Sequence, residues 1–365
     1  MLGYISRTVN LSLLVVFIGL NLLEYMKKNN WILLSRKDLF RSEFIDSMII
    51  VFAFLMISLV IQIYNKEFRT YLFSELLYNI LPPLVAFFWI NTTEKNERYT
   101  YFILLLVRNL IYFVFANIGS FTLANILAIS WNDSKSSVFE TPYAHDFFFL
   151  EIIFLTFGKE FIAVICMILC MLNFKRISFI LSGIVMIAYI LLKKNKKVKS
   201  ILSNSFPLNK KICFIILFVL CLLPMCIEWL NSAKGQETIY ELFQLNLNDF
   251  TTGRTGVMNY VVNNIGHFNG YGSSDYFMEN SPNETYRLLG SMHCDILKIY
   301  LETTIVGVIV YFGKLIKIAR KNWIVFLMLV YMIFELVFSH FIDVLSVWML
   351  FFMFTAMIYA ENGID

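Results

Sequence analysis

Residues 46–64 read DSMIIVFAFLMISLVIQIY, and this stretch decides the fold class. Its only charged side chain is Asp46, at the first position. A helix needs about 20 mostly apolar residues to cross the hydrocarbon core of a bilayer. Because the backbone finds no water there, such a stretch satisfies its peptide groups by folding as a helix. Residues 46–64 therefore predict a transmembrane helix.

Similar apolar runs occupy most of the 365 residues. Hydrophobic residues make up 59% of the chain and charged residues 15%, against about 25% charged residues in a typical soluble domain. This composition excludes a soluble enzyme domain. It predicts an all-α, polytopic integral membrane helical bundle of about 10–12 transmembrane helices, forming a single membrane domain over residues 1–365. The candidate spans are 9–25, 46–64, 73–91, 100–118, 145–157, 161–174, 177–192, 212–230, 294–313, 323–340 and 342–360.

Basic loops predict the orientation of these spans. Residues 193–211 contain seven lysines and no acid, and residues 314–321 form a second short basic loop. Both loops are expected in the cytoplasm because lysine and arginine accumulate on that side. Residues 231–293, between them, are therefore predicted to be a large extracytoplasmic loop. Two short helices are expected within it, over residues 238–247 and 257–265.

One uncertainty in the span count lies between His145 and Phe174. This stretch is either one long span or two short spans joined by a turn at Gly158–Glu160. Only a cytoplasmic turn at Gly158–Glu160 places the basic loop 26–44 inside. We therefore prefer eleven spans, with the N-terminus outside and the C-terminus inside.

Three basic side chains on the predicted outer side are candidates for chemistry. Arg176 lies in a turn between two spans, Arg254 lies in the large loop, and His293 lies where that loop re-enters the membrane. Guanidinium groups grip phosphate oxygens bidentately, and imidazole exchanges protons near neutral pH. The alternatives are a snorkelling side chain for Arg176, an ordinary solvated arginine for Arg254 and an interfacial residue for His293.

Other polar residues are weaker candidates. His145 and His340 are interpreted as interfacial packing residues on the same side. Glu302, inside the span after His293, is expected to pair or hydrogen-bond within the bundle because an isolated carboxylate there is costly. Tyr271, Tyr276 and Phe277 could stack on sugar faces or anchor the loop at the interface.

Several absences narrow the chemistry further. The sequence contains no Asp-x-Asp pair, no Walker-type loop and no His-Glu-x-x-His motif. All six cysteines lie in or beside apolar runs and are interpreted as small buried hydrophobes. We therefore expect no metal, no cofactor and no nucleic-acid partner, and a reaction on a substrate that is already activated.

The order of five short motifs resembles the O-antigen polymerase and ligase family, the Wzy-type polysaccharide polymerases. In that family an arginine follows a span, a loop carries Gly-Arg and then Gly-x-Gly, and His-Asn-x-x-Leu precedes Glu-x-Gly-x-x-Gly. The chain departs from the family pattern at Cys294, which replaces Asn, and at Thr304, which replaces the first Gly. The matching positions are Lys175-Arg176-Ile177-Ser178, Gly253-Arg254-Thr255, Gly270-Tyr271-Gly272, His293-Cys294-Asp295-Ile296-Leu297 and Glu302-Thr303-Thr304-Ile305-Val306-Gly307.

The resemblance implies a metal-independent membrane glycosyltransferase in the bacterial cytoplasmic membrane. It would join polyprenyl-diphosphate-linked oligosaccharide repeat units into a surface polysaccharide, such as O-antigen, capsule or exopolysaccharide, on the outer face. Arg176 and Arg254 would bind the departing diphosphate, and His293 would deprotonate the acceptor hydroxyl or orient the phosphates. The substrate-binding positions implied are Gly253, Gly270, Tyr271, Gly272, Asp295 and Glu302.

The partners implied are the lipid-linked oligosaccharide, membrane lipid, and the flippase and chain-length regulator of the same pathway. Three alternatives stay open. A ligase of the same family would transfer the finished glycan to another acceptor. A flippase or exporter of lipid-linked sugar would carry charged residues along a central cavity through both halves of the chain. A non-catalytic assembly subunit would need none of this chemistry.

Overall fold

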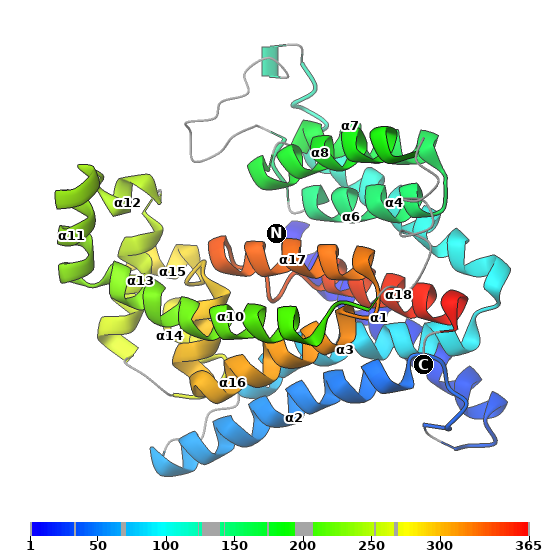
Figure 1. Cartoon of the computed structure of the whole chain (residues 1–365), viewed down its shortest axis with the longest axis horizontal. Helices are drawn as coiled ribbons and strands as arrows, with labels where there is room; N and C mark the ends of the chain where they lie inside the picture. The colour runs from blue at the N-terminus through cyan, green and yellow to red at the C-terminus, as the bar shows by residue number, and fades with distance from the viewer. Residues whose placement is uncertain are drawn as a thin grey trace. The chain divides into compact units, whose positions relative to one another are not determined.

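The fold is described by a computed structural model for residues 2–32, 34–66, 71–122, 124–125, 139–141, 143–173, 175–193, 207–251, 253–265 and 269–363. Across these ranges every regular element is a helix and none is a strand (Figure 1). This result confirms the predicted all-α class.

Each of the eleven predicted spans coincides with a helix. Most helix ends differ from the predicted ends by only a few residues, because apolar runs determine where helices can lie in a membrane. The largest differences are at the start of the first helix and at the end of α16. The helices are α1 (Leu2–Lys28), α2 (Arg41–Tyr64), α3 (Tyr71–Thr92), α4 (Lys95–Asn117), α6 (Tyr143–Thr156), α7 (Glu160–Asn173), α8 (Arg176–Lys193), α10 (Lys210–Asn231), α16 (Asp295–Ala319), α17 (Trp323–Phe338) and α18 (Leu345–Asn362).

The helices have the length and composition of a multi-pass membrane protein. Among the described residues, six helices are long and apolar enough to cross a bilayer, namely α2, α3, α4, α10, α16 and α18. In the most apolar 18-residue stretch of α10, only 17% is buried within the protein. The side chains of Phe214 and Phe218 in this helix are 69% and 57% exposed. Large apolar side chains exposed in this way indicate a lipid-facing surface.

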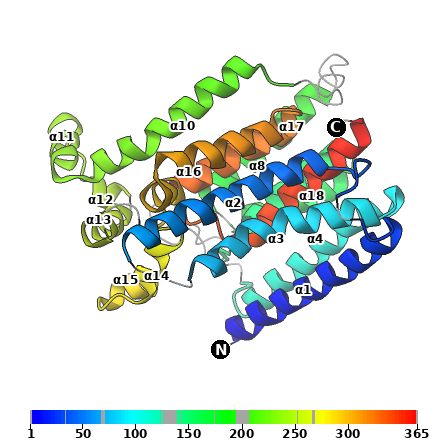
Figure 2. The same ribbon diagram turned by 90° about the horizontal axis from the view of Figure 1, so that it is seen from below.

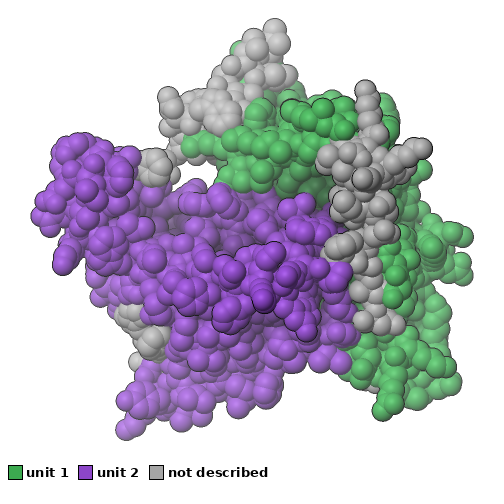
Figure 3. All heavy atoms as spheres, in the orientation of Figure 1, with its two compact units in different colours: residues 1–41, 82–205, 346–365 green, residues 42–81, 206–345 purple. Residues whose placement is uncertain are grey.

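The chain divides into two compact units, shown in different colours in Figure 3. Unit 1 comprises residues 1–41, 82–205 and 346–365, and unit 2 comprises residues 42–81 and 206–345. The chain passes from unit 2 to unit 1 inside α3, at the Pro82–Pro83 pair. No linker-like sequence marks this boundary, so the single domain expected over residues 1–365 is described here as two units.

In unit 1, α6 and α7 confirm the two-helix alternative for residues 145–174. Gly158 has φ +68° and lies in the turn between them, a conformation that suits glycine because it has no Cβ. Buried polar contacts join other helices of this unit. Asp146 accepts hydrogen bonds from Asn109 at 3.1 Å and Ser346 at 2.9 Å.

In unit 2, α2, α10 and α16 lie side by side (Figures 1 and 2). Phe54 of α2 stacks on Tyr311 of α16 with ring centroids 5.6 Å apart. On the other side of α16, a Cβ placed on Gly313 would lie 3.6 Å from Leu217 of α10. This is an ordinary van der Waals distance, so α10 packs directly against this side of α16.

The basic loop predicted over residues 314–321 is mostly helical, because α16 continues to Ala319. Lys314 and Lys317 pair with Asp46 at 2.8 Å and 2.7 Å, and Lys321 pairs with Glu43 at 2.6 Å. The acids in the first turns of α2 therefore neutralise the basic end of α16. Asp46, the charged residue of the predicted span 46–64, is satisfied in this way.

Between α10 and α16 the described residues form five short helices, of which α11 and α12 lie beyond the end of α10 (Figure 1). Two of them replace the predicted ones with different boundaries: α11 spans Ala233–Phe243 instead of 238–247, and α13 spans Arg254–Ile265 instead of 257–265. α11 starts earlier than predicted because the Ser232 side chain caps it, accepting a hydrogen bond from Gly235 N–H at 3.1 Å. The prediction relied on the apolar pattern and did not use this cap. The other helices are α12 (Leu247–Phe250), α14 (Ser273–Glu279) and α15 (Glu284–Leu289).

α16 is interrupted at Thr304. This residue has φ 68° and ψ 179°, a region that is essentially restricted to glycine and costs other residues about 1–3 kcal/mol. Its hydroxyl accepts a hydrogen bond from Val306 N–H at 3.2 Å. The break separates the first turns of α16, which carry Asp295, Lys298 and Glu302, from the apolar stretch that precedes Lys314.

We expect Thr304→Gly to stabilise the protein by about 1–3 kcal/mol, because glycine adopts the observed backbone conformation without a Cβ clash. The matched control is Thr303→Gly, since Thr303 lies in the regular helix, where glycine costs about 1 kcal/mol. Thermal unfolding of both variants in detergent measures the difference. A lower midpoint for Thr304→Gly than for the wild type would contradict the strain argument.

Candidate functional site

A buried lysine organises the end of unit 2 where α3 and α16 begin. Lys298, in α16, is fully buried. Its ammonium group forms ion pairs with Asp275 and with Glu75, the latter at 3.3 Å, and lies 5.6 Å from the centroid of the Tyr271 ring. A buried ammonium needs such partners because its desolvation costs several kcal/mol. Lys298 therefore ties α16 to α3 and α14.

Glu302, one helical turn beyond Lys298, holds the Gly-x-Gly loop. Its carboxylate accepts hydrogen bonds from Gly272 N–H at 2.9 Å, from Ser274 N–H at 2.8 Å and from the Ser274 hydroxyl. The expectation that Glu302 hydrogen-bonds within the bundle is thus confirmed. Both carboxylate oxygens of Glu302 accept hydrogen bonds from the protein. Glu302 therefore acts on a substrate only through the loop that it positions.

Asp295 joins the start of α16 to the turn that follows α17. Its carboxylate accepts hydrogen bonds from Phe341 N–H, from Ile342 N–H at 2.6 Å and from His340 Nδ1 at 2.8 Å. His340 Nε2 also lies 3.3 Å from Asp343. His340 therefore has charged partners on both ring nitrogens, which corrects its interpretation as an interfacial packing residue.

The charge of His340 follows from this arrangement. Burial disfavours the imidazolium, but the negative charges and hydrogen bonds of Asp295 and Asp343 outweigh it and raise the pKa of His340 to about 11. His340 is consequently a cation at neutral pH. Its protonated ring donates from both nitrogens and fixes the turn between α17 and α18.

Arg254 and His293 lie at the edge of this network. Arg254 is the first residue of α13, and its Nη1 donates a hydrogen bond to the carbonyl of Phe338, the last residue of α17. Burial, followed by the positive charges of Arg254 and His340, lowers the pKa of His293. His293 is therefore a neutral imidazole beside a fixed guanidinium, able to accept a proton at pH 7.

The two glycines of the Gly-x-Gly motif are required by geometry. Gly270 and Gly272 have φ +91° and +85°, and a Cβ on Gly272 would lie 2.5 Å from Cγ of Glu75. Between them, Tyr271 is fully buried, with its ring 4.6 Å from Phe54 and its hydroxyl accepting from Asn79 at 2.8 Å. Its ring faces protein side chains, so the expectation that it stacks on a sugar is not met in this structure.

We expect Gly272→Ala to destabilise the protein by more than the roughly 1–2 kcal/mol of a positive φ alone, because the new methyl group overlaps Glu75. Gly290→Ala is the matched control: Gly290 has φ +67° but no atom within 4 Å of its Cβ position. Denaturant unfolding in detergent compares the two. Equal losses of stability would show that the contact with Glu75 does not matter.

The remaining predicted residues are distributed between the units. Gly253 has φ +86° and allows the turn that leads into Arg254. Together with Asp295 and Glu302, Arg254 and His293 form one cluster in unit 2. Arg176 is the first residue of α8, in unit 1. Nζ of the preceding residue, Lys175, lies 3.0 Å from Nε2 of His145. His145 is fully buried.

Sequence analysis missed Lys298, Glu75 and Asp275. The spacing of charged residues could have indicated Lys298, because Asp295, Lys298 and Glu302 are three and four residues apart and share one helix face. Nothing local in the sequence pairs Lys298 with Glu75, since their contact joins residues 223 positions apart.

Comparison with protein families, curated proteins and solved structures gives no match.

Proposed function

We propose that the protein is a glycosyltransferase that polymerises polyprenyl-diphosphate-linked oligosaccharide repeat units on the outer face of the bacterial cytoplasmic membrane. The proposal is carried by the electrostatic contact between His293 and the guanidinium of Arg254, which together with burial lowers the pKa of His293. The imidazole of His293 can take a proton from a sugar hydroxyl, and the guanidinium of Arg254 can bind a diphosphate. The buried network around Asp295 and Lys298 keeps both on a rigid support.

In the proposed reaction, a hydroxyl of one lipid-linked unit attacks the anomeric carbon of another chain. The new glycosidic bond forms as the bond from that carbon to the diphosphate oxygen breaks, and His293 takes the hydroxyl proton. Arg254 stabilises the negative charge that develops on the departing polyprenyl diphosphate, an effect that contributes several kcal/mol in comparable sites. Arg176 is the second diphosphate ligand by resemblance. The transfer is driven by the higher free energy of the glycosyl diphosphate relative to the glycosidic bond that replaces it.

Backbone geometry supports the family resemblance on which this assignment draws. Thr304 occupies the position of a family glycine, and its φ of 68° and ψ of 179° are those of glycine. Gly270 and Gly272, the two glycines of the loop motif, both have positive φ. The chain thus has glycine-like conformations at three positions where the family pattern places glycine.

The placement of charge in unit 2 favours the polymerase over a flippase or exporter. Along α16, charged residues occur at Asp295, Lys298 and Glu302 and then not again until Lys314. The intervening residues are apolar or small, apart from two threonines and a tyrosine. A path for a charged headgroup through this unit would need polar groups along the helix.

Purified protein is expected to elongate a polyprenyl-diphosphate-linked repeat in the presence of EDTA, because in the proposed reaction the guanidinium of Arg254, and not a metal ion, stabilises the departing diphosphate. Chain-length ladders on a gel measure elongation. The metal-containing control is the same protein with Mg²⁺ in place of EDTA, which should give the same ladder. Loss of elongation in EDTA that Mg²⁺ restores would count against this mechanism.

A further inference from the structure

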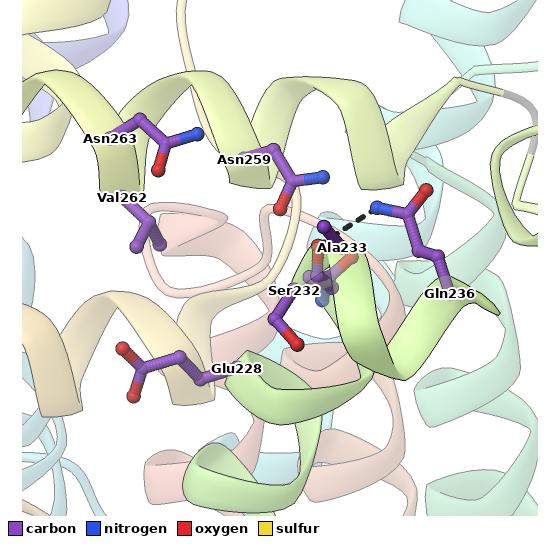
Figure 4. A pocket seen from close by; sticks show the side chains of 8 residues that line it. Glu228, Ser232, Ala233, Gln236, Asn259, Val262 and Asn263 are labelled. Carbon is purple, nitrogen blue, oxygen red and sulfur yellow. Dashed lines mark hydrogen bonds between the residues drawn. The ribbon is translucent and has the colours of Figure 1, made fainter. Parts of the chain in front are cut away.

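A polar pocket lies between the end of α10, the start of α11 and the face of α13, all in unit 2 (Figure 4). Its volume is about 420 Å³, within the range of about 300–1,000 Å³ typical of small-molecule sites. Most of its polar side chains are uncharged amides or hydroxyls. The pocket is lined by Glu228, Asn231, Ser232, Ala233, Gln236, Asn259, Val262 and Asn263.

Among the described residues, one buried polar atom of this lining has no hydrogen-bond partner. Asn231 is 3% exposed, and its Nδ2 donates to the carbonyl of Ile227 at 2.7 Å. Its Oδ1 is buried without a partner. An unsatisfied buried acceptor is costly, and in native proteins such an atom calls for a specific explanation. A donor supplied by a ligand in the pocket would satisfy it.

The chemistry of the lining indicates which ligand fits. Carboxamides present a donor and an acceptor side by side, which match the hydroxyl groups of a sugar. No lysine or arginine lines the pocket, and Glu228 contributes a carboxylate. A ligand with a negative charge would be repelled there, whereas a neutral polyhydroxylated ring would not.

The position of the pocket on α13 relates it to the proposed reaction. Asn259 and Asn263 follow Arg254 by five and nine residues on the same helix. At 1.5 Å and 100° per residue, they lie about 7.5 Å and 13.5 Å along the helix axis and about 140° and 180° around it from Arg254. The pocket therefore opens on the opposite side of α13 from the Arg254 position, and a glycan whose diphosphate binds Arg254 would pass around the first turn of the helix to reach it.

We propose that this pocket binds an uncharged sugar residue of the lipid-linked glycan, with Oδ1 of Asn231 accepting a hydrogen bond from a sugar hydroxyl. The inference rests on the proposed function and adds the class of sugar. It predicts that the repeat unit places a neutral sugar, and no uronic acid, at this position.

Saturation-transfer NMR on the full-length protein in detergent tests the proposal with named probes: the methyl glycosides of glucose, galactose, rhamnose and N-acetylglucosamine, and methyl glucuronide. We expect saturation of at least one neutral glycoside and none of the glucuronide. Asn231→Leu and Asn259→Leu should each weaken that signal at least about fivefold, by removing a hydrogen bond. Asn264→Leu, an exposed change on the same helix, should leave it unchanged.

Unfolding midpoints separate a binding role from a structural one. Asn231→Leu removes an unsatisfied acceptor, so its midpoint should equal or exceed that of the wild type. If Asn231→Leu does not fold, that result overturns the role of Asn231, and Asn259→Leu decides whether the pocket binds sugar. The proposal is overturned if no neutral glycoside depends on these two residues, or if the glucuronide binds equally well.

Glycan elongation distinguishes this inference from the proposed function. Wild-type protein that elongates lipid-linked repeats but gives no pocket-dependent saturation would reject the sugar pocket and retain the polymerase. Pocket-dependent saturation without elongation would reject the polymerase as the activity of this chain and retain a saccharide-binding site.

Discussion

Arg254→Ala and His293→Ala are each expected to lower glycan elongation at least about 100-fold while the protein remains folded in the membrane. The first change removes the guanidinium that stabilises the departing diphosphate, and fixed donors of this kind are typically worth a factor of about 100 to 1,000. The second removes the proton acceptor, a contribution of similar size. Chain-length ladders from purified variants, at equal protein amounts, measure both effects.

Arg287→Ala is the matched control for this pair. Arg287 lies in the same loop, in α15, and is exposed, so its loss should leave elongation within about twofold of the wild type because exposed charges contribute little. Near-normal ladders for both Arg254→Ala and His293→Ala would reject their catalytic assignment. Loss of folded protein would be visible as a lowered unfolding midpoint.

The two roles open to His293 have different pH dependences. If His293 is the base, it must be neutral, and its lowered pKa places the acid limb of kcat/KM below pH 6.5, the ordinary value for histidine. His293→Gln would then be inactive at every pH. If His293 only orients phosphates as a donor, His293→Gln keeps partial activity, since its amide also donates.

Lys298→Met should be the most destabilising single change in unit 2. It removes the cation that faces Glu75 and Asp275 and leaves two carboxylates near one another in a buried site. Removing one member of a buried ion pair costs about 3–5 kcal/mol. The expected result is a large fall in the thermal unfolding midpoint, with loss of elongation because α14 and the Gly-x-Gly loop lose their anchor.

Lys314→Met provides a matched control on the same helix. Lys314 also pairs with a carboxylate, but Asp46 keeps Lys317 as a second partner at 2.7 Å. We expect a loss below about 1 kcal/mol. A midpoint for Lys298→Met that matches that of Lys314→Met would contradict the central position given to Lys298. The double variant Lys298→Met, Glu75→Gln should recover part of the loss, because it removes one uncompensated charge.

Helix positions could be predicted from the sequence because hydrophobicity is a local property of the chain. The apolar run at 46–64 predicts the body of α2, although the helix begins at Arg41. The added turn contains Glu43, whose partner Lys321 is nearly 280 residues away in the chain. Polar helix ends of this kind depend on contacts that hydropathy does not report.

The candidate site was predicted only in part for the same reason. Arg254, His293 and Glu302 were found from short motifs and from the cost of charge in a membrane. His340 was underestimated because its partners, Asp295 and Asp343, become neighbours only through the turn after α17. The burial of Tyr271 was not predicted, because an aromatic residue between two glycines gives no local indication that its ring packs in the core of unit 2.

Binding of undecaprenyl diphosphate to the purified protein tests the central claim most directly, because it needs no acceptor and no knowledge of the sugar. Native mass spectrometry of wild type, Arg254→Ala and Arg287→Ala gives the three affinities side by side. We predict binding to the wild type and to Arg287→Ala, and at least about tenfold weaker binding to Arg254→Ala, as expected for loss of a charge-assisted contact. Equal affinity of all three proteins would contradict a diphosphate site at Arg254.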